Sequence, residues 1–82
     1  MITVKYFASI RESIGQGSEA LSSSAATMGA LRDELIARGG AHAESLSRGK
    51  AVRMALNQVM ADESAALVDG AEVAFFPPVT GG

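Results

Sequence analysis

The sequence contains no cysteine, one histidine and no long apolar run. The absence of cysteine excludes disulfides, a thiol nucleophile and a persulfide on this chain. A single histidine, His42, is too little for a histidine-rich metal site, so we expect no bound metal. Residues 1–7 lack the apolar stretch of a signal peptide, and no segment is apolar for long enough to span a bilayer. We therefore expect a cytoplasmic protein with no membrane partner.

Basic residues are also scarce. Seven Lys and Arg residues stand against nine Asp and Glu residues, and the basic ones do not form a cluster. Nucleic-acid binding normally requires a basic stripe, so we expect no nucleic-acid partner. The hydrophobic fraction of 48% excludes a disordered chain, and 82 residues are enough for one domain with a single small core.

The spacing of apolar residues predicts an α+β domain over residues 1–76, in which one main helix packs on a mixed sheet. Glu34 and Arg38 are four residues apart, which places both on the exposed side of the predicted helix in the order that favours an ion pair. Residues 8–14 are too short for a full helix and are expected to form a turn, whereas residues 42–47 are expected to add a short helical turn. The predicted strands cover residues 2–7, 19–21, 52–56, 59–61 and 73–76, and the predicted helix starts at the N-cap Thr27, carries an apolar stripe of Met28, Leu31, Leu35 and Ile36, and ends at Gly39-Gly40.

The alternation in the strands also predicts a partner surface. If Ile2, Val4, Tyr6, Val73 and Phe75 face the helix, then Phe7 and Phe76 face away from it. Met60 joins them if Val59 points into the core, and together they form an exposed apolar docking patch. Arg11 is added as a charge that could pair with the partner, although exposed charges near a turn are usually only solvated. The alternatives are that the chain itself covers this face, or that the alternation is displaced by one residue.

Residues 77–82 are predicted to be a flexible C-terminal tail, Pro-Pro-Val-Thr-Gly-Gly. Two prolines favour the extended polyproline II form, so six residues could reach on the order of 18 Å beyond the sheet. Gly81 and Gly82 have no Cβ and could enter a slot too narrow for side chains. The terminal carboxylate has a pKa of about 3.5 and is a poor electrophile when ionised. To react, it would need activation, most simply as an acyl-adenylate made by an ATP-dependent partner; the alternative is a passive tail.

Residues 75–82, Phe-Phe-Pro-Pro-Val-Thr-Gly-Gly, resemble the signature ending of the sulfur-carrying small subunits of molybdopterin synthase. The similarity extends to residues 4–12, the Asn57-Gln58 turn and residues 69–73, although Ala71 stands where an acidic residue is frequent in that family. The resemblance implies a ubiquitin-like β-grasp fold and a carrier that is not itself an enzyme. It also implies that Gly82 is adenylated, converted to a thiocarboxylate and used as the sulfur source for the dithiolene of molybdopterin.

The same resemblance implies the partners and the residues that meet them. The large synthase subunit would receive the tail residues Pro78, Val79, Thr80 and Gly81, with Gly82 at the reaction centre. This chain would bind no cofactor, because ATP is used by the activating enzyme, and a sulfurtransferase or cysteine desulfurase would supply sulfur indirectly. The alternatives are a related sulfur carrier for thiazole or cysteine synthesis, a ubiquitin-like protein modifier joined through Gly82 to a lysine, and a simple binding module.

Overall fold

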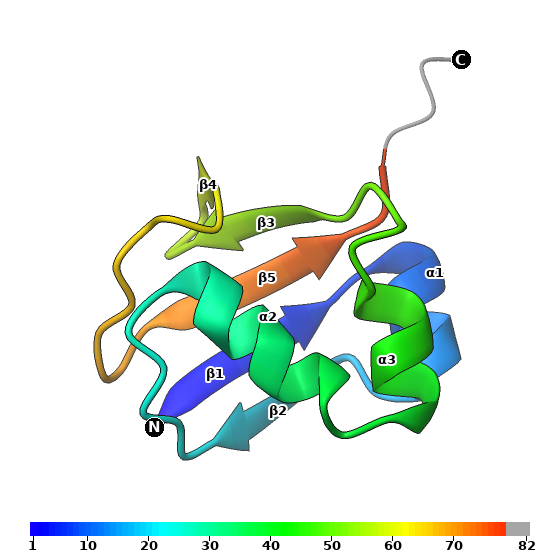
Figure 1. The fold of residues 1–82 in the computed structure, drawn as a ribbon, viewed down its shortest axis with the longest axis horizontal. Helices are drawn as coiled ribbons and strands as arrows, with labels where there is room; N and C mark the ends of the chain where they lie inside the picture. Colours follow the sequence, from blue (N-terminus) through cyan, green and yellow to red (C-terminus); the bar gives the residue numbers. More distant parts are fainter. Residues whose placement is uncertain (79–82) are drawn as a thin grey trace.

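One face of a five-stranded sheet is covered by helices in the computed structural model, which describes residues 1–78 (Figure 1). The sheet order is β2-β1-β5-β3-β4. Strands β1 and β5 are parallel, whereas the other neighbouring pairs are antiparallel, so the sheet is mixed. The elements are β1 (Ile2–Tyr6), α1 (Ala8–Ile14), β2 (Ser18–Leu21), α2 (Met28–Ile36), α3 (Gly40–Leu46), β3 (Arg53–Leu56), β4 (Val59–Ala61) and β5 (Glu72–Phe76). This arrangement confirms the predicted α+β class.

The core lies between the two central strands and α2. The Tyr6 and Phe75 rings stack with their centroids 6.2 Å apart, and both side chains are buried. Strand β1 is buried at every second residue, as its alternation predicts. Thr27 caps α2 as predicted, because its hydroxyl accepts a hydrogen bond from the Ala30 amide at 3.1 Å. The largest fully buried side chains are Tyr6, Phe75, Met28, Leu31, Leu35, Leu46, Val4 and Val73.

Residues 8–14 form a helix, so the prediction of a turn was wrong. Helix α1 begins after Phe7, whose carbonyl accepts the amides of Ile10 and Arg11, and it ends at Gly15 in the left-handed conformation. Ile10 is 4% exposed. A seven-residue helix is not stable in isolation. Burial of Ile10 in the core supplies the stability that local sequence cannot show, and α3 confirms the second short helix that was expected near residues 42–47.

The predicted pairing of Glu34 with Arg38 is also wrong. Helix α2 ends at Ile36, so Arg38 lies beyond the last helical turn. Its guanidinium donates to Glu19 Oε1 at 2.6 Å, and Glu34 accepts from the Ser23 hydroxyl at 2.7 Å. Each charge therefore binds a residue that is remote in sequence, which helical spacing does not predict.

The β3–β4 hairpin has the predicted turn, but Val59 does not point into the core as expected. Asn57 and Gln58 both have positive φ, at 49° and 69°, as the tightest hairpin turns require. Val59 pairs with Leu56 yet is 69% exposed. Strand β4 is a three-residue edge strand away from α2 and α3 (Figure 1), so nothing covers this side chain among the described residues.

Glu19 joins β2 to α3 and to the segment that follows α2. Its carboxylate accepts hydrogen bonds from the Tyr6 hydroxyl at 2.8 Å and from Arg38, and it lies 3.0 Å from His42 Nε2. Burial alone would raise the pKa of Glu19, but the hydrogen bonds from Arg38, His42 and Tyr6 together lower it to about 2. Burial and the Glu19 carboxylate both raise the pKa of Tyr6.

Protonation of Glu19 is expected to make the protein less stable at acid pH. Its pKa falls from an ordinary 4.5 to about 2 on folding, so the unfolded chain binds more protons between these values. The stabilisation is complete above pH 4.5 and is lost as the pH falls toward 2, by on the order of 1 kcal/mol after solvent screening. Urea unfolding of the wild type and Glu19→Gln at pH 7 and pH 2.5 measures this term. The stability gap between them should shrink at pH 2.5, and a gap independent of pH would contradict the assignment.

Candidate functional site: the outer sheet face and the base of the tail

The two aromatic residues predicted to face away from the helix lie together at the end of the sheet. The Phe7 and Phe76 rings stack with centroids 5.0 Å apart and planes inclined by 15°. The Phe7 amide donates to the Phe75 carbonyl at 3.2 Å, which fixes Phe7 beside the end of β5. Phe7 is 41% exposed and Phe76 is half-buried. The chain therefore presents an aromatic pair at the end of β5, next to Pro77.

Met60 lies on the same outer face of the sheet but two strands away from Phe76. The strand registers place Met60 opposite Ala55, and Ala55 opposite Ala74. Both alanines are buried, whereas Met60 is 58% exposed. Small apolar residues thus connect Met60 to the Phe7–Phe76 pair, and we call these five residues the outer-face patch. The role of this patch in partner binding is a prediction from the sequence.

The other predicted residues are less closely grouped. Arg11 is exposed on α1, and its guanidinium lies against Gly17, where an added Cβ would be 3.2 Å from Arg11 Nε. Pro78 is the last described residue. The predicted tail residues Val79, Thr80, Gly81 and Gly82 lie outside the described residues, so their part in the site remains a prediction.

An open cavity of about 450 Å³ lies at the base of the tail, and no pattern in the sequence predicted it. It is bounded by α1, α3, the segment before β3 and the two prolines. Three serines and one lysine line it together with five apolar residues. The lining residues are Ser9, Ile10, Ser13, Ser45, Lys50, Ala51, Val52, Pro77 and Pro78. The prolines that end β5 therefore face the α3–β3 connection across a hollow.

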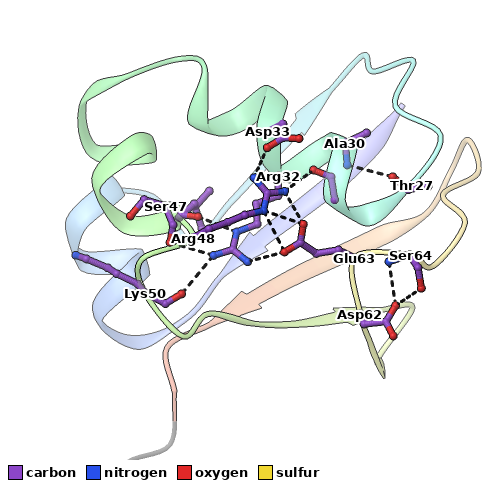
Figure 2. Close-up of polar contacts among 12 residues, drawn as sticks. Thr27, Ala30, Arg32, Asp33, Ser47, Arg48, Lys50, Asp62, Glu63 and Ser64 are labelled. Carbon is purple, nitrogen blue, oxygen red and sulfur yellow. Dashed lines mark hydrogen bonds and ion pairs between the residues drawn. The ribbon is translucent and has the colours of Figure 1, made fainter.

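Arg32 was not predicted as a site residue, although it lies on the apolar stripe of α2. Met28, Leu31, Arg32 and Leu35 follow the i, i+3, i+4, i+7 pattern of a buried face, which is the signal that could have revealed it. Arg32 is 4% exposed, and its guanidinium donates to the last backbone carbonyl of α3, to two carbonyls of the α3–β3 connection and to Glu63 (Figure 2). Burial lowers the pKa of Arg32, and the Glu63 carboxylate opposes that effect.

Within residues 1–78, no group of three or more metal-ligating side chains is gathered at one place. The helices in that range are also too short and too polar to cross a membrane. The described surface therefore offers an apolar face, a cavity and the start of the tail.

Comparisons with known proteins agree with this architecture. The ThiS family matches residues 4–82. A molybdopterin synthase sulfur carrier subunit from Haemophilus influenzae is 42% identical over 82 residues, which cover the whole of both chains. The crystal structure of SAMP1 from Haloferax volcanii has a TM-score of 0.75 and 27% identity, covering 99% of this chain and 98% of that one.

A structure with a partner subunit is also similar. It is the complex of subunits 1 and 2 of the molybdopterin-converting factor from Helicobacter pylori, with a TM-score of 0.69 and 26% identity over 99% of this chain and 97% of the matched one. These likenesses confirm the ubiquitin-like β-grasp fold. The chain belongs to the ThiS family, and its predicted resemblance to the sulfur-carrying subunits of molybdopterin synthase is confirmed.

Proposed function

We propose that this chain is the sulfur carrier subunit of a molybdopterin synthase and that it carries sulfur as a thiocarboxylate on Gly82. The observation that carries the proposal is the 42% identity to a sulfur carrier subunit along the full length of both chains. The family match extends to residue 82 and so includes Gly81-Gly82. The chain has no cysteine, which leaves no side-chain thiol to hold the sulfur. As a carrier subunit, the chain is not itself an enzyme.

The chemistry requires activation of the carboxylate by a separate enzyme. A carboxylate oxygen of Gly82 attacks the α-phosphorus of ATP and pyrophosphate leaves, which gives an acyl-adenylate. A sulfide equivalent then adds to the acyl carbon and AMP leaves, which gives the thiocarboxylate. A sulfurtransferase or cysteine desulfurase provides that sulfide equivalent indirectly. This chain contributes the reacting carboxylate, whereas the adenylating enzyme binds the ATP.

The second partner is the large synthase subunit. The Helicobacter pylori structure is a complex of subunits 1 and 2 of the molybdopterin-converting factor, and one of its chains resembles this one. The large subunit would dock on the outer-face patch, whose Phe7–Phe76 pair lies immediately before the two prolines. Its catalytic side chains would then transfer sulfur from Gly82 to the pterin precursor.

Phe76→Asp is expected to weaken binding of the large subunit at least tenfold, about 1.4 kcal/mol, while the fold is kept. The change places a charge in the only aromatic pair that the described residues present on the outer face. Val68→Asp is the matched control, because it also places a charge at an apolar residue. Val68 is 65% exposed and lies before the first residue of β5, whereas Phe76 is the last residue of that strand. Calorimetric titration of both variants tests this. Wild-type affinity for a folded Phe76→Asp variant would remove Phe76 from the interface.

Intact mass spectrometry tests the proposed function. The chain is incubated with the cognate adenylating enzyme, ATP and a sulfur donor. Replacement of one oxygen by sulfur should add about 16 Da, and omission of ATP should prevent the addition. The activity of the enzyme preparation is first checked on another carrier. If the mass of this chain then does not increase, the sulfur-carrier function is excluded.

A protein modifier is the second candidate, because the similar Haloferax volcanii structures include one described as small archaeal modifier protein 1, at 26% identity and a TM-score of 0.74. In that function Gly82 would form an amide with a lysine amine instead of accepting sulfur. The same incubation with added cell extract separates the two functions, since a modifier would give covalent conjugates that survive thiol treatment. A carrier for thiazole or cysteine synthesis would gain the 16 Da but would not restore activity to the large synthase subunit.

A further inference from the structure

The buried Arg32 side chain connects α2 to the segment that joins α3 to β3. Its Nε donates to the Leu46 carbonyl at 2.7 Å, and its Nη2 donates to the carbonyls of Ser47 and Lys50 at 3.1 and 3.4 Å. Its Nη1 lies 3.3 Å from Glu63 Oε2. One guanidinium therefore holds the last carbonyl of α3 and two carbonyls of the following connection (Figure 2).

The two carbonyls in the connection are also the ones that form its turns. Ser47 O accepts the Lys50 amide at 3.0 Å, and Lys50 O accepts the Val52 amide at 2.9 Å. Arg32 thus binds the acceptors of both consecutive turns. Its planar group has five donors in a fixed arrangement, so it fixes the relative orientation of these carbonyls in a way that a single ammonium does not.

Glu63 holds the guanidinium from its other side and is itself held by Arg48. Arg48 donates to Glu63 through Nε at 2.9 Å and to the Gly29 carbonyl at 3.2 Å, and it also pairs with Asp33. Glu63 is packed closely on α2, because a Cβ on Gly29 would lie 2.9 Å from Glu63 Oε1. Arg32 is therefore held between α2, the α3–β3 connection and the segment after β4 (Figure 2).

The fixed connection forms one wall of the cavity at the base of the tail. Arg53, the first residue of β3, pairs with Phe76, the last residue of β5. Val52 and Pro77 are the next residues outward on these antiparallel strands, and both line the cavity. Lys50 and Ala51 line it as well, together with residues of α1. The position of the connection thus determines what Pro77 and Pro78 face as the chain leaves the sheet.

We propose that Arg32 is a positioning residue for the tail: by fixing the connection 47–52, it sets the direction in which Pro77 and Pro78 leave the sheet, and so the presentation of Gly82 to the adenylating enzyme. This inference rests on the proposed function. Arg32 touches neither the substrate nor the reacting carboxylate. It acts through the Ser47 and Lys50 carbonyls and the cavity wall.

Arg32→Met is the informative variant, because methionine keeps an unbranched apolar stem and removes every donor. Without them the connection samples several conformations, and only a fraction of molecules presents the tail base correctly. The apparent affinity of the partner falls by that fraction, so KM for the carrier should rise about tenfold while kcat changes less than about twofold. Arg32→Lys supplies fewer donors in a less rigid arrangement and should give an intermediate KM.

The test measures ATP–pyrophosphate exchange by the adenylating enzyme against carrier concentration, at a temperature where each variant is folded. Amide hydrogen exchange at Lys50 and Val52 is followed in the same samples. Leu21→Ala is the control, because Leu21 is 7% exposed and pairs with Ile2 at the opposite end of the sheet. It should lower the melting temperature and leave KM unchanged.

Faster exchange at Lys50 and Val52 together with a higher KM in Arg32→Met supports the proposal. Wild-type KM in the folded Arg32→Met variant would overturn it, and so would an equal rise in KM for Leu21→Ala. If Arg32→Met does not fold, Arg32→Lys decides in the same way. If the wild type supports no ATP–pyrophosphate exchange, the proposed function is rejected instead. In that case amide hydrogen exchange still tests Arg32, because unchanged rates at Lys50 and Val52 in Arg32→Met would reject its role.

Discussion

Deletion of Gly82 is expected to abolish sulfur loading while the domain remains folded. The carboxylate would move back by one residue, about 3.3–3.6 Å of extended chain. Misplacement of a reacting group by about 1 Å already costs on the order of 100-fold in rate, so a shift of a whole residue should reduce thiocarboxylate formation below detection. The measurement is the intact mass of the variant after incubation with the adenylating enzyme, ATP and a sulfur donor.

The deletion also separates classes of function. The outer-face patch and the core lie within residues 2–76, so affinity for the large subunit through the patch and the melting temperature should change little. A binding module would retain all of its activity without Gly82, whereas a carrier or a modifier would lose it. Loading of the deletion variant at the wild-type rate would show that Gly82 is not the reacting residue.

Phe75→Ala is expected to cost about 3–5 kcal/mol of folding free energy, the range for removing a fully buried aromatic side chain. Phe75 has no exposed surface and stacks on Tyr6 in the centre of the core. A domain of this size has a total stability of roughly 4–12 kcal/mol, so the variant should be close to unfolded or lose more than about 12 °C in melting temperature. Urea and thermal unfolding followed by circular dichroism measure the loss.

The neighbouring position provides the control. Phe76 is on the opposite face and stacks on Phe7, so Phe76→Ala should cost only about 1 kcal/mol of stability. The two variants remove the same side chain from adjacent positions of one strand. Similar losses for both would contradict the assignment of the inner and outer faces of β5.

The features that sequence predicted well are those determined by short-range periodicity. Alternation places Val4 and Tyr6 in the core, and it distinguishes Phe75 from Phe76. The hydroxyl of Thr27 and the turn at Asn57-Gln58 were also predictable, because capping and tight turns depend on a few consecutive residues.

The features that sequence missed depend on contacts between distant segments. Helix α1 is too short to form alone and depends on burial of Ile10 in the core. Val59 is exposed because β4 is an edge strand, which alternation does not reveal. Arg32 could have been noticed on the apolar stripe, but its partners in residues 46–50 and 63 follow only from the tertiary structure. The cavity beside Pro77 likewise requires four separate segments to be placed together.

The most direct test of the account is to locate the sulfur within the loaded chain. Arg53 is the last basic residue, so trypsin releases residues 54–82 as one peptide. Tandem mass spectrometry of that peptide should place the increase of about 16 Da on the smallest C-terminal fragments, those that contain only Gly81 and Gly82. An increase on any other part of the chain, or a peptide of unchanged mass from a preparation that supplies sulfur, would contradict the assignment of Gly82 as the carrier residue.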